Sequence, residues 1–371
     1  MTQTTDRPTT TPTLPWGAPF AVLGANHAMV LPDAEIRKET VADAQHRALN
    51  AQSDEILGVL IPFERDALAT TFLGRPSSQP ETDAVHDPGS LDATSLVADI
   101  RFNEHEAARY MLALDHARRT LTTDPALSKV VLSRIERYTW RGIHPARVLL
   151  SRNRDLHRAA YRYQATSAPD MGSVIAGATP ELFLRKRGST VLLHPMAGTV
   201  SRALPKVEAE ARLRTPKYLE EHALLVDFMT TRLESLSAKV TGDPEPSVVE
   251  AGSVWHLGTE IRAEVPASVS VADLVDLLHP SPAVCGVSQT RAREVISELE
   301  PERRHYGGLV GWLTPQGDGD LYMALRGLEI ESKTGTVTLR AGGGITATSD
   351  PLTEFEETAD KLEAMRRVLN L

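Results

Sequence analysis

Acidic and basic side chains supply most of the chemistry that this sequence can do. Near the C-terminus, Glu354, Glu357 and Lys361 are spaced i, i+3 and i+7, so a helix would place them on one face. Glu221 opens another amphipathic stretch. Several carboxylates without accompanying Cys or His suit a hard, oxygen-preferring ion such as magnesium. An exposed Glu357–Lys361 pair and a Glu221 favoured by the helix dipole are the plain alternatives.

Cations and glycines form a second group of candidate residues. Lys129 introduces an apolar strand, and Arg326 lies in an apolar strand at 322–328, where a cation needs a partner. Glycines in the run 341–344 would let backbone N–H groups approach an anion closely. A solvated strand-edge lysine and a tight strand-to-helix turn explain the same residues without any ligand. These residues alone leave both interpretations open.

Other kinds of active site find no support. The sequence has no G-x-x-x-x-G-K-[ST] loop and no strand-linked G-x-G-x-x-G, which argues against nucleotide binding. No His/Cys cluster has zinc spacing. With one cysteine, Cys285, and no G-x-S-x-G elbow, covalent nucleophilic catalysis is also unsupported.

Composition and charge indicate a soluble globular protein. The 371 residues are 41% hydrophobic and 24% charged, and this length can bury a core without disulfides. The net charge of -9 argues against nucleic acid as a partner, because phosphate binding needs a basic face. No apolar run is long enough to span a membrane, and no secretory signal is visible. We therefore expect a cytoplasmic protein, which a single cysteine permits.

Periodicity predicts the elements that must position these residues. A Thr- and Pro-rich arm at 1–15 is expected to be disordered, and 16–371 to form one catalytic domain with a long loop at 75–95. Helical spacing predicts helices at 104–121, 218–236, 292–299 and 352–369. Strands are predicted at 20–23, 130–132, 173–184, 191–193, 309–313 and 321–329. Because turns join most strands, the fold class is α+β with largely antiparallel sheets.

Six blocks, in order, resemble the chorismate-utilising enzymes, a family of isochorismate, salicylate, anthranilate and aminodeoxychorismate synthases. The resemblance runs from about Lys129 to the C-terminus. The blocks are KVVLSR at 129–134, GATPELF at 177–183, PMAGT at 195–199, Glu221-His222 with Val226-Asp227, HPSPAVCG at 279–286, and 341–345 with Glu354, Glu357 and Lys361. Each block alone is weak, but six in this order favour the functional interpretation.

The resemblance implies a fold and a cofactor. The fold would be a single large α+β domain of two mostly antiparallel sheets flanked by helices, with the active site in a cleft between them. The cofactor would be Mg²⁺, with Glu221 and Glu357 as direct ligands and Glu354 in the same cluster. The ion would hold the ring carboxylate of chorismate, which explains how an acidic protein binds a dianion.

The resemblance also assigns the catalytic residues. Lys129 matches the family's general base and Glu181 its general acid, which would act on opposite faces of the ring. Such a base needs a lowered pKa and such an acid a raised pKa. Arg326 and Lys361 match the positions that bind the enolpyruvyl carboxylate, with the Gly342 backbone assisting. The other substrate-binding positions are Gly198, Thr199, Thr259 and Ala283.

Three positions favour an isochorismate synthase within this family. Lys129 stands where water-using members have lysine, Ala197 replaces the nucleophilic lysine of aminodeoxychorismate synthases, and Ala283 replaces a threonine that is usual in salicylate synthases. The expected reaction is the magnesium-dependent conversion of chorismate to isochorismate, by water addition with loss of the ring hydroxyl. We expect no attached glutaminase, and the sequence is compatible with a monomer.

Departures from the family pattern leave the product and the pathway open. Asp320-Leu321, Val287-Ser288-Gln289 and Tyr218-Leu219-Glu220 each replace a more usual sequence near the expected pocket. Salicylate synthase and an ammonia-using aminodeoxyisochorismate or anthranilate synthase component are the alternatives within the family. Outside it stand an inactive homologue that binds an aromatic acid and a subunit that holds a glutaminase. The pathway could serve siderophore, menaquinone or other secondary-metabolite synthesis.

Overall fold

The computed structural model describes residues 18–24, 28–50, 54–77, 95–98, 100–152, 161–167, 172–236 and 239–371. The predicted arm at 1–15 and most of the predicted loop at 75–95 lie outside these ranges. Ser95, the last residue of that predicted loop, instead begins a strand. No described helix is both long enough and apolar enough to cross a membrane.

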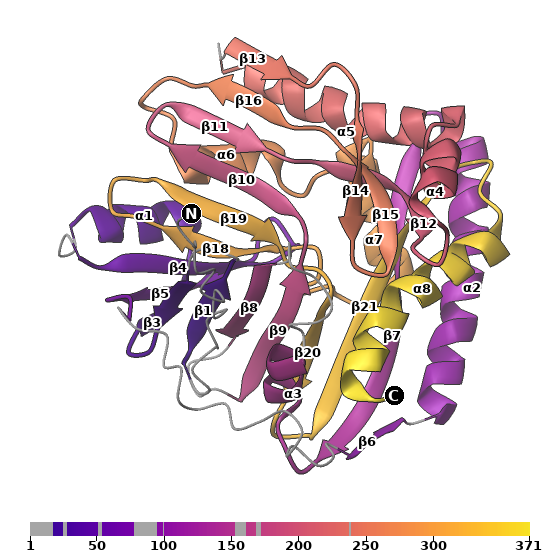
Figure 1. Ribbon diagram of the computed structural model, residues 1–371, viewed down its shortest axis with the longest axis horizontal. Coiled ribbons are helices and arrows are strands. Elements are labelled where there is room, and N and C mark those ends of the chain that lie inside the picture. The colour runs from indigo at the N-terminus through magenta and orange to yellow at the C-terminus, as the bar shows by residue number, and fades with distance from the viewer. Residues whose placement is uncertain are drawn as a thin grey trace, which may run out of the picture.

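Two large sheets form the body of the described structure (Figure 1). In spatial order, the first consists of β17 (Gly286–Val287), β7 (Lys129–Arg141), β21 (Thr336–Ile345), β20 (Gly327–Glu331), β9 (Ser173–Thr179), β8 (Tyr161–Thr166), β1 (Phe20–Leu23) and β2 (Ala28–Leu31), with β6 (Ser95–Ala98) also beside β7. The second consists of β13 (Lys239–Gly242), β16 (Ile261–Glu264), β11 (Thr190–Leu193), β10 (Leu182–Arg187), β19 (Gly319–Met323), β18 (Leu309–Leu313), β4 (Ile56–Ile61), β5 (Ala69–Gly74) and β3 (Glu35–Glu39).

A third, smaller sheet of β12 (Met196–Ser201), β15 (Val254–Gly258) and β14 (Ser247–Ala251) was not predicted. Neighbouring strands pair antiparallel in all three sheets. This arrangement of large antiparallel sheets with flanking helices confirms the predicted α+β fold class.

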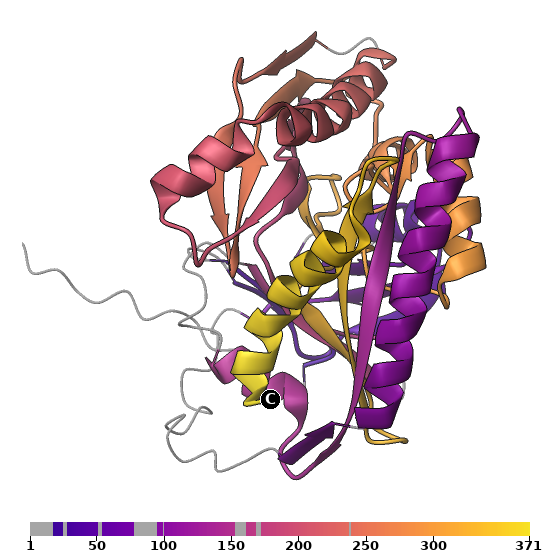
Figure 2. The same ribbon diagram turned by 90° about the vertical axis from the view of Figure 1, so that its right-hand side faces the viewer.

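Helices cover the outside of the sheets (Figure 2). They are α1 (Val41–Leu49), α2 (Ile100–Thr123), α3 (Pro145–Arg152), α4 (Lys206–Leu213), α5 (Pro216–Glu234), α6 (Val271–Leu278), α7 (Gln289–Leu299) and α8 (Pro351–Leu369). Helix α2 packs on β7, α8 packs on β21 and against α2, and α5 packs on the third sheet. The predicted start of α8 is confirmed: Asp350 caps it by accepting from the Thr353 N–H at 2.9 Å, and Pro351 occupies its first turn.

The two large sheets pack face to face through an apolar core. Phe20 of β1 and Phe72 of β5 lie there with ring centroids 5.1 Å apart, beside the buried Leu60 and Tyr163. The other face of the first sheet packs on α3 and α8 through residues such as Leu339. Burying each large apolar side chain contributes about 1.5–3 kcal/mol, so this core holds the strands that carry the site.

Two segments that were predicted as single strands each pass from one sheet to the other. Residues 173–184 divide into β9 and β10, because Pro180 has no N–H with which to continue the ladder. Residues 321–329 divide into β19 and β20, so the prediction that Arg326 lies within a strand is wrong. Arg326 instead has a left-handed backbone with φ of 52°, a sharp change of direction.

The two crossover segments, Pro180–Glu181 and 324–326, hold each other in place. The Ala178 N–H donates to the Arg326 carbonyl at 3.1 Å, and the Met323 N–H donates to the Glu181 carbonyl at 3.1 Å. These bonds fix Glu181 and Arg326 next to each other at the junction of the two sheets.

The glycine run lies inside a strand. Residues 336–345 pair with β7, with Gly344 opposite Val131, so the alternative of a strand-to-helix turn is wrong. A Cβ on Gly344 would lie 2.7 Å from Lys129 Cε and 3.0 Å from Glu221 Oε1. Glycine is therefore needed at this position because two charged side chains cross the strand there.

Candidate active site

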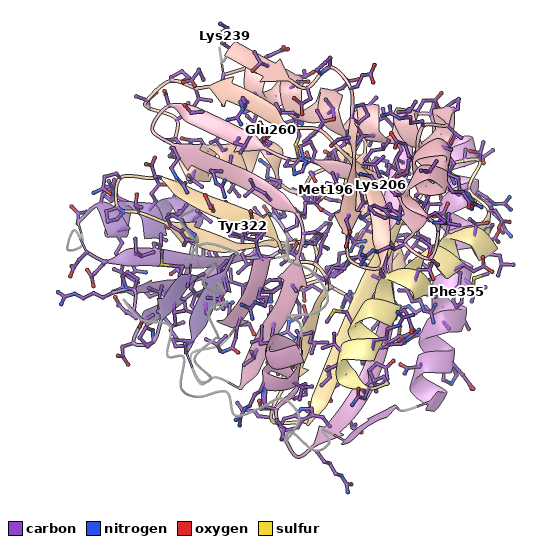
Figure 3. The ribbon with its side chains drawn as sticks, viewed as in Figure 1. Met196, Lys206, Lys239, Glu260, Tyr322 and Phe355 are labelled. Carbon is purple, nitrogen blue, oxygen red and sulfur yellow. The ribbon has the colours of Figure 1, made fainter. Side chains whose placement is uncertain are left out.

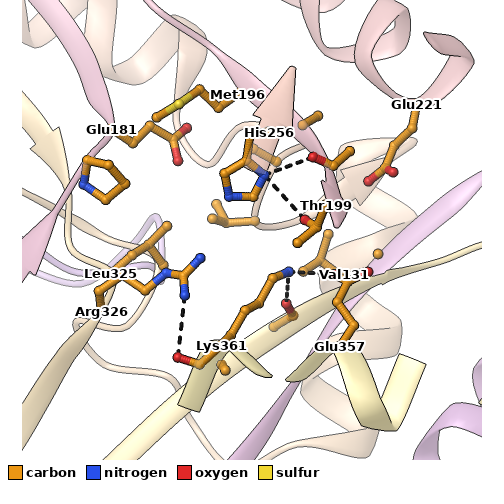
Figure 4. A pocket seen from close by; sticks show the side chains of 18 of the residues that line it. Val131, Glu181, Met196, Thr199, Glu221, His256, Leu325, Arg326, Glu357 and Lys361 are labelled. Atoms are coloured by element: carbon orange, nitrogen blue, oxygen red, sulfur yellow. Dashed lines mark hydrogen bonds and ion pairs between the residues drawn. The ribbon is translucent and has the colours of Figure 1, made fainter. Parts of the chain in front are cut away.

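A cavity of about 90 Å³ lies where the crossover segments meet β7, β21, the third sheet, α5 and α8 (Figure 4). Met196 of its wall lies near the middle of the molecule, whereas Lys239 lies at the edge (Figure 3). Most of the site residues predicted from the sequence line this cavity: Lys129, Glu181, Gly198, Thr199, Glu221, Ala283, Arg326, Gly342, Glu357 and Lys361.

Lys129 and Glu221 form an ion pair at one end of the cavity. Lys129 begins β7 and is only 2% exposed, and its Nζ donates to Glu221 Oε1 at 2.9 Å. Glu221 reaches this point from the first turns of α5. Burial by itself raises the pKa of Glu221, but the bonded Lys129, together with the charges of Lys361 and Lys217, more than reverses this effect, so the pKa lies below its ordinary value. Glu221 is therefore ionised.

Glu181 lies on a different side of the cavity, with its carboxyl directed inward (Figure 4). Burial raises the pKa of Glu181 to about 8, although the charges of Arg326 and Lys361 act in the opposite direction. A carboxyl that stays protonated near neutral pH can give up a proton to a leaving group. Glu181 therefore has the raised pKa that a general acid needs.

Arg326 and Lys361 bring two cations to the cavity. Lys361 of α8 donates from Nζ to Glu357 Oε1 at 2.5 Å and to the Gly342 carbonyl at 2.8 Å. Arg326 Nη1 donates to the Lys361 carbonyl at 3.4 Å. Burial lowers the pKa of Arg326, which nevertheless stays charged, as an arginine does in a protein. This region can bind an anion.

The three carboxylates predicted to hold magnesium do not converge on one point. In the described part of the chain, no three His, Cys, Asp or Glu side chains are close enough together to hold a metal ion. Glu221 and Glu357 bond to lysines, and Glu354 is buried behind Gly343. Burial, with the charge of Glu357, raises the pKa of Glu354 to about 7. Carboxylate oxygens are nevertheless the ligands that a hard divalent cation prefers, so the chemistry of Glu221, Glu354 and Glu357 fits Mg²⁺.

Thr259 is a predicted substrate residue that does not line the cavity. Its Oγ1 lies 2.8 Å from Nε2 of the buried His222. His222 directly follows Glu221 in the sequence. Glu354 does not line the cavity either. Both residues lie behind the wall that the other predicted residues form.

Three polar residues of the cavity wall were missed by the sequence interpretation: His256, Tyr306 and Arg340. Trp255 and Leu257 pack into an apolar cluster, so strand alternation turns His256 of β15 the other way. Its Nδ1 donates to the Gly198 carbonyl at 2.9 Å, which leaves Nε2 as an acceptor. Burial, helped by nearby cations, lowers the pKa of His256 to about 3, so the ring is neutral.

The departures from the family pattern have different surroundings. Asp320 does not line the cavity; it accepts from Arg185 and Tyr322 within the second sheet. Val287 pairs with Lys129 and so supports the backbone of the proposed base. Tyr218 packs under Gly198, where an added Cβ would lie 3.2 Å from Tyr218 Cβ. Two of the three departures thus contact residues of the cavity wall.

Comparison with known proteins agrees with the geometry. Residues 27–367 match the family model described as chorismate binding enzyme. The chain is 33% identical over 371 residues to a Mycobacterium tuberculosis protein provisionally named isochorismate synthase MenF, an alignment that covers 95% of this chain and 96% of that protein. It is 35% identical over 256 residues to the isochorismate synthase EntC of Escherichia coli K12, covering 68% of this chain and 64% of that protein.

A solved structure has the same fold. It is that of a Bacillus anthracis protein, DhbC, provisionally named a 2,3-dihydroxybenzoate-specific isochorismate synthase. The TM-score is 0.81 at 26% sequence identity, and the match covers 96% of this chain and 97% of that one. The chain belongs to the chorismate-binding enzymes, the family that its six sequence blocks resemble.

Proposed function

We propose that this enzyme is an isochorismate synthase that adds water to chorismate and expels the ring hydroxyl. The observation that carries the proposal is one cavity with an amine, Lys129, at one end and a protonated carboxyl, Glu181, at another. The names of the relatives agree with this reaction. The fold alone would not distinguish it from other reactions of the family.

The charges of the cavity suit a substrate with two carboxylates. Lys129 and Lys361 each pair with a glutamate, whereas Arg326 and Arg340 make no ion pair with any described residue. With Glu181 protonated, cations outnumber ionised carboxylates in the wall. An anionic substrate would supply the missing negative charge, which is otherwise costly to leave unbalanced.

In the proposed reaction the atoms balance. Lys129 takes a proton from water as the water oxygen bonds to the ring, and Glu181 gives its proton to the departing hydroxyl, which leaves as water. To act as a base, Lys129 must hold no extra proton, and the adjacent Glu221 carboxylate opposes this at 2.9 Å. Glu221 therefore needs another positive partner while Lys129 acts.

Glu221, Glu357 and Glu354 are the residues that we propose hold Mg²⁺. The ion, when bound, would supply that positive partner and bind the ring carboxylate of the substrate. Arg326, Lys361 and the Gly342 backbone would orient the enolpyruvyl carboxylate. Ala283 offers only a methyl group to the cavity, which gives no hydroxyl to help position an intermediate for pyruvate elimination.

Product analysis tests the proposal. The purified chain is incubated with chorismate and Mg²⁺, and the products are separated by chromatography. We expect isochorismate to accumulate, with little salicylate or pyruvate, and ammonium to give no amino product. Stoichiometric pyruvate would identify a salicylate synthase, an amine would identify the anthranilate branch, and the lack of any turnover would favour an inactive binding homologue.

One catalytic domain and a cytoplasmic location remain predictions, and cell fractionation tests the predicted location.

A further inference from the structure

One polar residue interrupts the buried face of α5. The buried residues of this helix are His222, Leu225, Met229 and Leu233, and the helix packs on strands of the third sheet. Apolar contacts tolerate small shifts along or around a helix axis, whereas a polar group in a buried stripe fixes one arrangement when it is bonded. His222 is only 3% exposed. The hydrogen-bond partner of His222 therefore decides how α5 sits on the sheet.

That partner is Thr259, the residue that follows β15. Its Oγ1 shares a hydrogen bond of 2.8 Å with His222 Nε2, and Thr259 is also buried. The Thr259 N–H donates to the Pro195 carbonyl at 3.3 Å, directly before β12. A Cβ on the preceding Gly258 would lie 2.8 Å from Val249 Cγ2, so this end of the third sheet is closely packed. Thr259 is thus a fixed point to which the helix is bonded.

The bond to Thr259 is the one hydrogen bond that the His222 ring makes with the described residues. The other ring nitrogen, Nδ1, is buried and has no partner among them. Loss of the Thr259 hydroxyl would leave both ring nitrogens without a bond to the protein, which is unfavourable for a buried polar group. We therefore expect the ring, and the helix with it, to shift when this hydroxyl is removed.

Glu221 precedes His222 on the same helix. Consecutive helical residues are about 1.5 Å and about 100° apart, so the backbone that His222 fixes also carries Glu221. The Glu221 carboxylate meets Lys129 at 2.9 Å, and a Cβ on Gly344 would lie only 3.0 Å from Glu221 Oε1. There is little space around this carboxylate, so a shift of the helix by about 1 Å would misplace it.

We propose that His222 and Thr259 are positioning residues for Glu221. Their hydrogen bond sets the place of the Glu221 carboxylate, and thereby the affinity of Glu221, Glu354 and Glu357 for Mg²⁺. This role rests on the proposed function, because Glu221 is a ligand of the proposed metal. In place of the substrate contact that the sequence resemblance implies, Thr259 acts on Glu221 through His222.

Calorimetric titration of the whole chain with Mg²⁺, without chorismate, tests this role. Thr259→Val removes the hydroxyl and keeps the shape of the side chain. It should raise the dissociation constant for Mg²⁺ at least about tenfold, the lower end of the effect of losing a group that supports a metal ligand. Thr259→Ser keeps the hydroxyl and should bind Mg²⁺ as the wild type does. Should the second methyl of valine prevent folding, Thr259→Ala takes its place with the same expected result.

Thr166→Val is the matched control. Thr166 is fully buried at the end of β8, and its Oγ1 donates to the Ser173 carbonyl at 3.0 Å. It does not line the large cavity. The change removes one buried hydrogen bond of the first sheet, so thermal melting should show a lower Tm. The dissociation constant for Mg²⁺ should stay that of the wild type.

The kinetic constants distinguish positioning from contact with the substrate. At saturating Mg²⁺, KM for chorismate should be unchanged in Thr259→Val, because Thr259 does not line the cavity. A raised KM with unchanged Mg²⁺ affinity would overturn the proposal and make Thr259 a substrate-binding residue.

Other outcomes also decide the question. Wild-type Mg²⁺ affinity in Thr259→Val, equal weakening in Thr166→Val, or no recovery in Thr259→Ser would overturn the proposal. A wild type that binds no Mg²⁺ would refute the metal assignment together with this role. A wild type that binds Mg²⁺ but does not convert chorismate would refute only the proposed reaction.

Discussion

The Glu181 end and the Glu221 end of the cavity can be compared directly, because both carboxyls line the same space. Burial raises the pKa of Glu181 to about 8, since its cationic neighbours do not bond to it. Glu221 bonds to Lys129 at 2.9 Å, and the pKa of Glu221 is lowered. Identical side chains thus have opposite shifts in pKa, so that one is protonated near neutral pH and the other is ionised.

Different parts of the fold produce the two ends. Glu181 lies on a crossover between sheets, where backbone bonds hold it without an ionic partner. Glu221 lies on a helix that packs against the third sheet, and Gly344 lets its carboxylate meet Lys129 across a strand. Changes at either end should therefore affect different properties of the enzyme.

Removal of metal should have the largest effect, and only at the Glu221 end. We expect a chelator to abolish turnover and added Mg²⁺ to restore it, because every proposed ligand is a carboxylate. Glu221→Gln and Glu357→Gln should fold yet be inactive. Glu181→Gln should bind Mg²⁺ as the wild type does, as measured by equilibrium dialysis. Full turnover in excess chelator would refute the metal assignment.

Lys129→Ala should remove the proposed base. Loss of a general base lowers kcat by about 10²–10⁴-fold. Steady-state kinetics of isochorismate formation measures the effect, and Lys239→Ala on the exposed strand β13 is the matched control. A wild-type rate for Lys129→Ala would mean that another group activates water.

Gly344→Ala should disturb the Lys129 end and leave the Glu181 end intact. The added methyl would displace Lys129 or Glu221, and a misplacement of about 1 Å can lower the rate by about 10²-fold. Gly242→Ala, where the nearest atom to a Cβ lies at 3.6 Å, should behave like the wild type. A normal kcat for Gly344→Ala would show that the ion pair does not need its present geometry.

The pH dependence should report the Glu181 end, with the smallest effect. An acid must be protonated to act, so kcat/KM should fall as the pH rises through about 8, the raised pKa of Glu181. Above this value the rate should fall about tenfold per pH unit. The falling limb should persist in Gly344→Ala and disappear in Glu181→Gln. A limb that survives in Glu181→Gln belongs to another group.

Part of the fold could be predicted from the sequence, because periodicity marks the helices α2, α5, α7 and α8 and some of the strands, whereas α1, α3, α4, α6 and the third sheet were not predicted. Helix α8 matches its prediction, and β18 and β19 form the predicted hairpin, although its second strand ends at Met323 and not at residue 329. The division of 173–184 between two sheets could not be predicted, because an apolar run looks the same on either sheet. For the same reason, the sequence did not show that Arg326 lies between two strands and not within one.

The site could be predicted where motif blocks carried the residues, as at Lys129 and Glu181. His256, Tyr306 and Arg340 are outside those blocks, and only the fold brings them to the cavity. Strand alternation offered a signal for Arg340, which stands two residues before Gly342. The bond between Lys129 and Glu221 had no sequence signal, because 92 residues separate the partners.

Oxygen-18 water tests most directly whether the two ends act together. If Lys129 activates water at one end while Glu181 expels the ring hydroxyl at the other, turnover in labelled water must place one labelled oxygen on the ring. Mass spectrometry of the isochorismate formed at early times measures this, before the reverse reaction exchanges the substrate. We predict one label per product molecule. Unlabelled isochorismate would mean that the original hydroxyl migrates, and would contradict the division of labour between Lys129 and Glu181.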